Sequence, residues 1–310
     1  MKILVTGGAG YIGSVLVQKL LEKKYEVTVI DNFFFKQNSL KSLYSFKNFI
    51  LIEDDVRNLD LLKKVVNNFD FILPLAALVG APLCDKNPKD AKEINQNSLV
   101  YLSSILKEHI GIILPTTNSG YGIGKKDVFC TEDSPLNPIS VYALTKVEAE
   151  KSVMMRKNSI SLRLATVFGM SPRMRTDLLV NYFIYKAIKE KKIEIFEGNF
   201  KRNYVHIEDV ANIFLFCIDN FQRLKSNIFN FGIEGANLTK TELAIKIKKY
   251  IPEFEFLKNE FTQDPDKRDY IVSNKKILDA GFKFKWNIDN GIEDLINKMK
   301  ELPEGNYTNI

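Results

Sequence analysis

The sequence has few cysteines and no long apolar run. Cys84, Cys130 and Cys217 are odd in number, lie far apart and show no paired spacing, so neither a disulfide framework nor a zinc site is indicated. No stretch approaches the roughly 18 apolar residues of a membrane span, and the apolar run at 1–6 is too short for a secretory signal. We therefore expect a cytoplasmic protein with no targeting segment, no membrane association and no bound metal.

A strong excess of charge of one sign is also missing. Lys and Arg number 44 against 38 Asp and Glu, and the basic residues are scattered, as at 240–249, instead of forming one block. This distribution indicates a solvated surface and disfavours nucleic-acid binding. A mildly basic surface also suits a phosphorylated substrate.

The 310 residues, of which 45% are hydrophobic, suffice for one large α/β domain or two modest ones. Apolar, β-branched runs alternate with helical stretches, and these runs lie at 2–6, 26–30, 49–53, 70–74, 110–115 and 159–164. The alternation predicts an α/β fold in which residues 1–169 form a Rossmann domain with a doubly wound parallel sheet. We expect 203–230 to return to that domain.

Beyond Gly169 the spacing becomes irregular. It predicts a smaller C-terminal α/β substrate-binding region made of residues 170–202 and 231–310. The elements expected after Gly169 are helices near 177–190, 238–250 and 289–300, a helix from Asp209, and strands near 193–196 and 227–230.

Three glycines follow the first apolar run at intervals of three residues. Gly7 permits a tight turn, Gly10 lets the backbone approach a diphosphate, and Gly13 allows close helix packing. The free N–H groups and the dipole of the following helix attract an anion. The strand before the turn and the helical pattern of Ile12 and Leu16 after it indicate a dinucleotide site.

The second apolar run ends at Asp31, whose carboxylate can accept hydrogen bonds from both hydroxyl groups of an adenosine ribose. The same negative charge repels the 2′-phosphate of NADP. Residues 32–35 include no arginine that would attract that phosphate. The sequence therefore predicts NAD as the cofactor. The simpler alternative is that Asp31 only caps a loop.

Tyr142 and Lys146 stand four residues apart where a predicted helix opens after Pro138. One helical turn separates the two side chains, so both point the same way. With the glycine turn upstream, the chain resembles, over nearly its whole length, the extended short-chain dehydrogenases/reductases of the sugar-nucleotide epimerase and dehydratase family. The resemblance implies an NAD-dependent enzyme that oxidises a sugar hydroxyl.

In that family the tyrosine takes the hydroxyl proton while NAD takes a hydride. A phenol with a pKa near ~10 is a poor base at neutral pH, so Lys146 and the positive nicotinamide would stabilise the phenolate of Tyr142. Thr117 matches the family's serine or threonine that orients the reacting hydroxyl. Asn118 and Ser119 stand where 4,6-dehydratases carry Asp and Glu. Neither can replace an acid or a base, so dehydration is disfavoured.

The resemblance implies further contacts to the cofactor. Besides the three glycines, Asp31, Tyr142 and Lys146, the residues carried over are Tyr11, Ile12, Asn32, Asp55, Val56, Leu75, Ala76, Ala77 and Asn95. Pro74 departs from the family, in which a histidine often precedes the Leu-Ala-Ala segment. The backbone role of that segment should survive this change.

Three arginines, Arg175, Arg202 and Arg268, stand where relatives hold a nucleoside diphosphate. A guanidinium matches two phosphate oxygens with its fixed fork, and binding energy gained there positions the sugar. With residues 117–119, these arginines complete the predicted substrate site. A surface salt bridge is the simpler role for each arginine.

Two polar residues near the start of one predicted helix have structural interpretations. His206 is flanked by apolar residues, which favours a structural histidine over a catalytic one. Asp209 is expected to cap the helix or to clamp the Rossmann core.

Within the family, four segments most resemble the GDP-D-glycero-D-manno-heptose 4-dehydrogenases of capsule biosynthesis: 75–82, 116–124, 164–175 and 264–274. The resemblance implies a GDP-heptose substrate whose C4 hydroxyl becomes a ketone. A nucleotide-sugar 4-epimerase, which uses the same residues, remains an alternative. A non-catalytic NAD-sensing protein is a further one, since fold does not dictate function.

Relatives pair two helices from each subunit into a four-helix bundle, so the resemblance also implies a homodimer. The helices expected to form it lie near 92–108 and 142–156. The apolar residues available for a contact face are Leu99, Leu102, Ile105 and Leu106.

Overall fold

The computed structural model describes residues 1–259 and 268–309. Its centre is a seven-stranded parallel sheet in the order β11-β7-β5-β4-β1-β2-β3. The strands are β1 (Lys2–Thr6), β2 (Glu26–Asp31), β3 (Phe49–Glu53), β4 (Phe71–Pro74), β5 (Gly111–Thr117), β7 (Ser159–Leu164) and β11 (Asn227–Phe231). All six apolar runs are strands of this sheet, which confirms the predicted doubly wound α/β fold.

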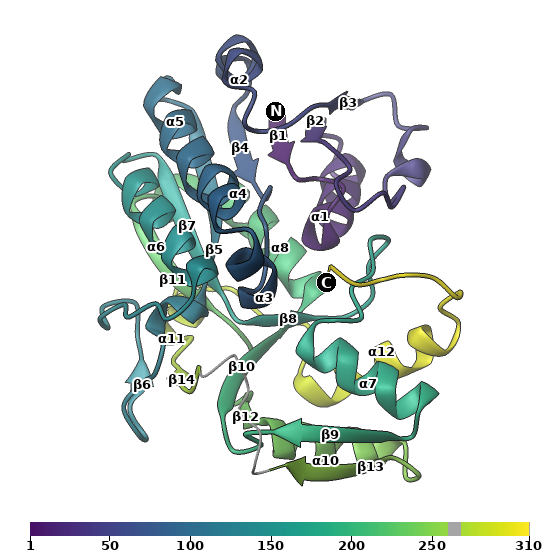
Figure 1. Cartoon of the computed structure of the whole chain (residues 1–310). Helices are drawn as coiled ribbons and strands as arrows, with labels where there is room; N and C mark the ends of the chain where they lie inside the picture. The colour runs from purple at the N-terminus through teal and green to yellow at the C-terminus, as the bar shows by residue number, and fades with distance from the viewer. Residues whose placement is uncertain (260–267, 310) are drawn as a thin grey trace.

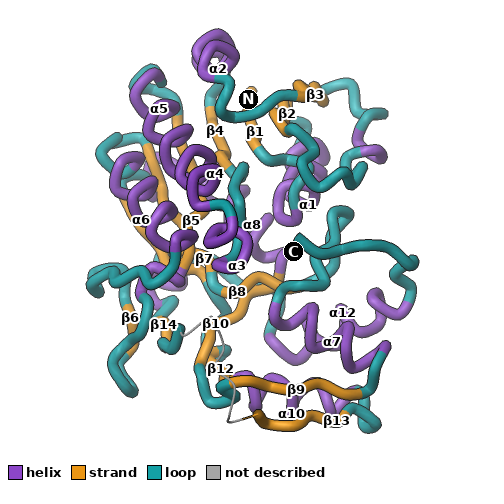
Figure 2. The backbone as a smooth tube through the Cα atoms, in the orientation of Figure 1, coloured by secondary structure: helices purple, strands orange, loops and turns teal. Residues whose placement is uncertain are grey.

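Helices cover both faces of the sheet (Figures 1 and 2). Alternate residues of β1 point to opposite faces, as a strand requires. Ile3 and Val5 pack with α1 (Tyr11–Glu22) and α8 (Ile207–Asp219). Leu4 packs in a second core with α2 (Leu59–Val65), α5 (Ser98–Ile105) and α6 (Val141–Val153). The sheet is therefore buried on both sides.

Smaller sheets lie below the large sheet in Figure 1. β8 (Thr166–Phe168), β10 (Lys201–His206) and β12 (Asn237–Thr239) form one sheet, β9 (Lys192–Phe196) pairs with β13 (Glu255–Asn259), and β6 (Phe129–Cys130) pairs with β14 (Ile271–Val272). The remaining helices are α3 (Ala81–Lys86), α4 (Pro88–Lys92), α7 (Leu179–Lys189), α9 (Phe221–Leu224), α10 (Lys240–Tyr250), α11 (Lys275–Asp279) and α12 (Ile288–Lys300). Of the segment 203–230, β11 joins the large sheet, whereas β10 pairs with β8 and β12.

The helix expected near 92–108 is interrupted, and its apolar face is not free. A π-helical turn, Glu93–Asn97, separates α4 from α5. Leu99, Leu102 and Leu106 are at most 6% exposed and pack on the large sheet. The prediction that these leucines offer a contact face is wrong, because burying the sheet already uses them.

Few special features mark the rest of the described chain. None of its helices is both long and apolar enough to cross a membrane. The same residues contain no cluster of His, Cys, Asp and Glu side chains that suits a metal ion. The three cysteines are buried free thiols.

A buried ion pair joins α6 to the strands behind the candidate catalytic residues. Arg163 of β7 donates to Glu150 of α6, with Nη2 and Oε1 2.7 Å apart, and both side chains are at most 5% exposed. The other carboxylate oxygen, Oε2, accepts hydrogen bonds from Thr116 at 2.9 Å and Ser161 at 2.6 Å. The carboxylate is thus fully hydrogen-bonded, as a buried charge needs to be.

We expect Glu150→Gln to destabilise the protein by about 3–5 kcal/mol, because it leaves the Arg163 charge buried without its partner. Urea unfolding measures the change. The matched control on the same helix is Glu148→Gln, whose exposed pair with Lys151 should contribute less than about 1 kcal/mol. Equal losses for the two variants would contradict this account.

Candidate cofactor and substrate site

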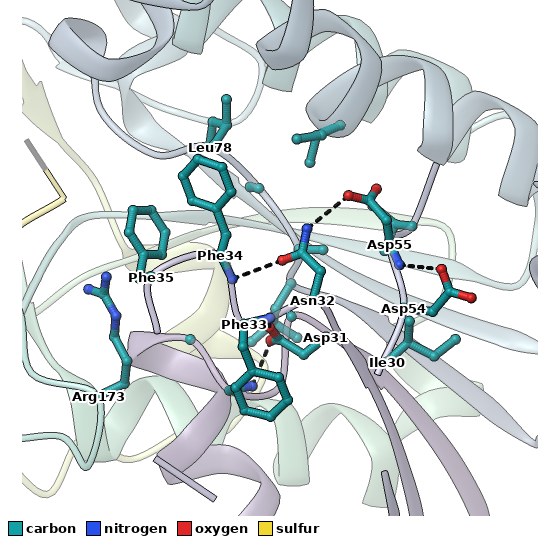
Figure 3. Close-up of a pocket in the computed structure, with 18 of the residues that line it drawn as sticks. Ile30, Asp31, Asn32, Phe33, Phe34, Phe35, Asp54, Asp55, Leu78 and Arg173 are labelled. Atoms are coloured by element: carbon teal, nitrogen blue, oxygen red, sulfur yellow. Dashed lines mark hydrogen bonds between the residues drawn. The ribbon is translucent and has the colours of Figure 1, made fainter. Parts of the chain in front are cut away.

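Two adjoining cavities open where β1, β2 and β4 end. The strand order reverses between β1 and β4, which is the place where sheets of this kind bind ligands. The first cavity is lined mainly by residues at or after the ends of β1 to β4, including Asp31, Asp55 and Leu78 (Figure 3). The second contains Thr117 and Tyr142.

The glycine turn has a geometry that larger residues would not permit. Gly7 has a φ of +71°, and a Cβ there would lie 2.5 Å from the backbone nitrogen of Ala76. A Cβ on Gly13 would lie 2.5 Å from the Gly7 carbonyl oxygen. Gly10 lines both cavities, so its backbone is open to a ligand. This cradle fits the diphosphate of a dinucleotide.

Asp31 holds its carboxylate in the first cavity through backbone hydrogen bonds. The N–H group of Ala9 donates to Oδ2 at 2.9 Å, and that of Phe33 donates to Oδ1 at 2.8 Å. Burial raises the pKa of Asp31, and these hydrogen bonds oppose the rise. The fixed carboxylate fits the predicted ribose acceptor.

Asp55 shares the first cavity with Val56 and with the loop 75–77. The side chain of Asn32 donates to Asp55 Oδ2 at 2.8 Å, and Nε of Arg57 donates to Oδ1 at 2.9 Å. The Arg57 hydrogen bond is the main reason that the pKa of Asp55 is lowered. Asp55 therefore stays ionised at neutral pH beside the site predicted for adenine.

The three predicted catalytic residues come together in the second cavity. Thr117 ends β5, and Tyr142 and Lys146 lie one turn apart on α6. The Thr117 hydroxyl donates to Ser119 Oγ at 2.8 Å and accepts the Ser119 N–H group at 3.1 Å. A hydroxyl, a phenol and an amine thus line one space.

Burial acts on both ionisable groups of this set. It raises the pKa of Tyr142 to about 12, while the charges of Arg268 and Arg175 and the neighbouring Thr117 hydroxyl oppose the rise. It lowers the pKa of Lys146 to about 8, against the pull of Glu150. The positive charges that favour the Tyr142 phenolate in the protein alone therefore include two arginines of the predicted substrate site.

Arg268 and Arg175, two of the three arginines predicted to bind the substrate, line the second cavity. Nη1 of Arg268 donates to Ser119 Oγ, which places this guanidinium next to Thr117. Arg175 forms an ion pair with Asp177, and both side chains are 8% exposed. Two guanidinium groups therefore line the cavity that holds the predicted catalytic residues.

Arg202 lies elsewhere. It is 2% exposed, does not appear in the described lining of either cavity, and has its guanidinium carbon 5.9 Å from the Tyr270 ring centroid. Its Nη1 donates to the carbonyl oxygen of Lys201 at 2.9 Å. Tyr270, whose ring Arg202 contacts, does line the second cavity.

Asn95 and Asn118 were also predicted to contact ligands, but the described cavity walls include neither. Asn118 is 1% exposed. Asn95 Oδ1 accepts the N–H group of Leu78 at 2.8 Å, and its Nδ2 donates to the Leu78 carbonyl at 2.9 Å and to Thr145 Oγ1 at 3.3 Å. Asn95 therefore ties the cofactor loop to α6, next to Lys146.

His206 and Asp209 have structural contacts. The His206 ring stacks on Trp286 with centroids 4.0 Å apart, and burial lowers its pKa to about 3. His206, not Asp209, caps α8 by accepting the N–H group of Glu208. Asp209 accepts N–H groups of Lys285 and Trp286, so it is a clamp on the segment before α12.

Several cavity residues were not predicted from the sequence: Phe35, Ser140, Arg173, Tyr270 and Asn309. Arg173 stands two residues before Arg175, in the segment 164–175 that resembles the family. The motif alone does not indicate which arginine faces the cofactor end. Asn309 lies far along the chain from the other residues of the cavity, and no local sequence pattern indicates that it lines the cavity.

Known proteins match this chain in sequence and fold. The NAD dependent epimerase/dehydratase family matches residues 3–232. The uncharacterised UDP-glucose epimerase YtcB of Bacillus subtilis is 34% identical over 67% of this chain and 70% of its own. Protein CapI of Staphylococcus aureus is 30% identical over 68% of this chain and 67% of its own.

A solved structure matches almost the whole chain. It is the UDP-glucuronic acid 4-epimerase from Bacillus cereus in complex with UDP-glucuronic acid and NAD. Its sequence is 25% identical to this one, and the match covers 97% of this chain and 99% of that chain with a TM-score of 0.82. The fold of that epimerase is therefore also the fold of this chain.

Lys146→Met should stabilise the cofactor-free protein at pH 7 by up to about 3 kcal/mol, because the lowered pKa means that the buried ammonium opposes folding. Below about pH 8, Lys146 is charged in the folded and unfolded states, so the full penalty applies. Between about 8 and 10.5 only the unfolded state keeps the proton, and the penalty disappears.

Urea unfolding of both proteins at pH 7 and pH 10 measures this difference. Lys151→Met on the same helix is the control, because the Lys151 side chain is 65% exposed and its removal should change stability little at either pH. A Lys146→Met protein that is less stable than the natural chain at pH 7 would refute the claim that the buried Lys146 ammonium opposes folding.

Proposed function

The chain belongs to the NAD dependent epimerase/dehydratase family, and on that premise we propose that it oxidises the C4 hydroxyl of a nucleoside-diphosphate sugar to a ketone. The observation that carries the proposal is the meeting of Thr117, Tyr142 and Lys146 in a cavity that continues into the glycine cradle. An alcohol bound in this cavity would have Tyr142 as its proton acceptor and the cofactor site next to it.

Each side chain has its own role in removing the proton of the sugar hydroxyl. Tyr142 takes the proton of the C4 hydroxyl, and Thr117 orients that hydroxyl by hydrogen bonding. Lys146 and Arg268 supply positive charge that favours the phenolate form of Tyr142. Bound NAD would accept the hydride that leaves C4, which is the chemistry this cofactor supplies.

The lining of the second cavity argues against dehydration. Its described residues include neither Asp nor Glu. Removing water from a sugar needs an acid for the departing hydroxyl and a base for the neighbouring carbon. Asn118 and Ser119 supply neither, so oxidation at C4 is the reaction that these side chains support.

For the substrate, we propose a GDP-heptose, used in the biosynthesis of a capsular or other surface polysaccharide. The support is the resemblance of segments 75–82, 116–124, 164–175 and 264–274, the last lying partly outside the described residues. Arg268 and Arg175 would bind the anionic part of the nucleotide sugar.

A 4-epimerase is the second candidate, and the names of relatives favour it. YtcB and the Bacillus cereus structure are both described as epimerases of UDP-sugars. The same residues serve both reactions, because an epimerase also forms the ketone and then reduces it from the other face. The product therefore distinguishes the candidates.

Purified protein incubated with UDP-, GDP- and dTDP-sugars should oxidise one of them, with a gain of absorbance near about 340 nm and a 4-keto product in the NMR spectrum. Two sugars that equilibrate without net absorbance change would support the epimerase. No change in any nucleotide sugar would contradict the proposal.

Tyr142→Phe should lower kcat about 10²- to 10⁴-fold, because it removes the group that takes the proton. NAD affinity should change little, which separates catalysis from binding. Thr117→Val should lose rate and Thr117→Ser should keep most of it. Tyr182→Phe, at a tyrosine 38% exposed on α7, is the control and should retain full activity.

We also propose a homodimer formed through α5 and α6. The leucines of α5 are buried against the sheet and are not available for a contact. The support is two exposed apolar residues, Val100 on α5 (40% exposed) and Leu144 on α6 (49% exposed). Sedimentation should give twice the chain mass for the natural protein and a single chain for Leu144→Glu. A monomeric natural protein would contradict this arrangement.

A further inference from the structure

Six residues line both cavities and therefore mark the passage between them: Gly7, Gly10, Phe35, Leu75, Ala77 and Arg173. The cavity with Asp31 suits the adenosine of a dinucleotide, and the cavity with Tyr142 suits its reactive end. The diphosphate that joins two nucleosides has to occupy the passage. Of the six residues, Arg173 alone carries a charge.

Arg173 is buried without full compensation. Its side chain is 2% exposed, and Nη1 has no hydrogen-bond partner among the described residues. Burial and the charge of Arg175 lower the pKa of Arg173 to about 10. A buried donor without an acceptor costs free energy, and an anion bound there would recover it.

The position of Arg173 is fixed relative to the glycine turn. Its guanidinium carbon lies 4.3 Å from the ring centroid of Phe35, and the two side chains lie next to each other in Figure 3. Its backbone N–H group donates to Ser171 Oγ, which in turn donates to the carbonyl of Tyr11 at 2.7 Å. Tyr11 is the first residue of the helix that follows the turn.

The segment that follows α12 ends at the second cavity, beside Arg173. In Figure 1 it returns in yellow from α12 to the centre of the molecule. The Tyr307 carbonyl accepts the N–H group of Thr176 at 2.8 Å, and the Asn306 carbonyl accepts Nε2 of Gln37 at 3.4 Å. Asn309 lines the second cavity, and its side-chain oxygen accepts Nη2 of Arg173.

We propose that Arg173 binds the diphosphate of the dinucleotide, and that residues 306–309 form a strap that holds Arg173 over it and slows cofactor release. The strap joins the loop after β2, through Gln37, to the loop after β8, through Thr176 and Arg173. The inference rests on the proposed function only in taking NAD as the ligand.

Cofactor-free protein should bind NAD and ADP-ribose, both of which contain the diphosphate, about 10- to 100-fold more weakly after Arg173→Met. Arg173→Lys, which keeps the charge, should recover part of the affinity. Arg223→Met removes an arginine on α9 and should change neither affinity. Titration calorimetry gives the dissociation constants, and circular dichroism establishes that each variant is folded.

Unchanged binding of NAD and ADP-ribose by a folded Arg173→Met protein would overturn the proposal. A loss confined to NADP would also overturn it, because Arg173 would then serve a 2′-phosphate. The natural chain separates the two proposals: if it binds NAD but converts no sugar nucleotide, the proposed function fails while this inference stands.

Asn309→Ala tests the strap without altering the buried arginine. NADH, followed by its fluorescence after displacement with excess NAD, should leave this variant about three- to tenfold faster than the natural chain, because Nη2 of Arg173 loses its acceptor. This variant decides the question if Arg173→Met does not fold. An unchanged release rate would refute the role of the strap.

Discussion

The close approach of two backbone segments governs this structure. At Gly7 the turn after β1 passes so near the loop after β4 that a Cβ would meet Ala76 at 2.5 Å. The contact lies where the strand order reverses, so the first helix begins at the edge where the sheet opens to ligands. Only glycine fits at position 7, because any side chain would clash with Ala76. The turn after β1 and the loop after β4 together bound a cradle for an anion.

The cofactor end and the catalytic end are tied together by hydrogen bonds. Asn95 holds both backbone groups of Leu78 and contacts Thr145, the neighbour of Lys146 on α6. One turn further along α6, Glu150 anchors the helix to β7. These contacts hold the loop after β4 against α6, which suits a reaction that needs close alignment of sugar and cofactor.

The sequence predicted the parts that are local. The glycine spacing, Asp31 at the end of a strand and Tyr142 one turn before Lys146 each depend on a few neighbouring residues and on the period of one element. These features sufficed for the doubly wound sheet and for the NAD-dependent family.

Contacts between remote segments were beyond such reasoning. Whether Arg173, Arg175 or Arg202 faces a cavity depends on how the loop after β8 and the strand β10 pack. In the packed structure the guanidinium of Arg202 lies over the Tyr270 ring. The leucines of α5 carry a helical apolar pattern that suits a subunit interface as well as a sheet. Only the packed structure shows that the sheet occupies them.

The central claim, oxidation at C4 of a nucleotide sugar beside bound NAD, is tested most directly with an isotope. A nucleotide sugar that carries deuterium at C4 is incubated with an equal amount of enzyme, and the dinucleotide is released by denaturation and weighed by mass spectrometry. The account predicts a reduced dinucleotide heavier by one deuterium, together with a 4-keto sugar. Deuterium that stays on a sugar of unchanged C4 configuration, with every nucleotide sugar supplied, would contradict it.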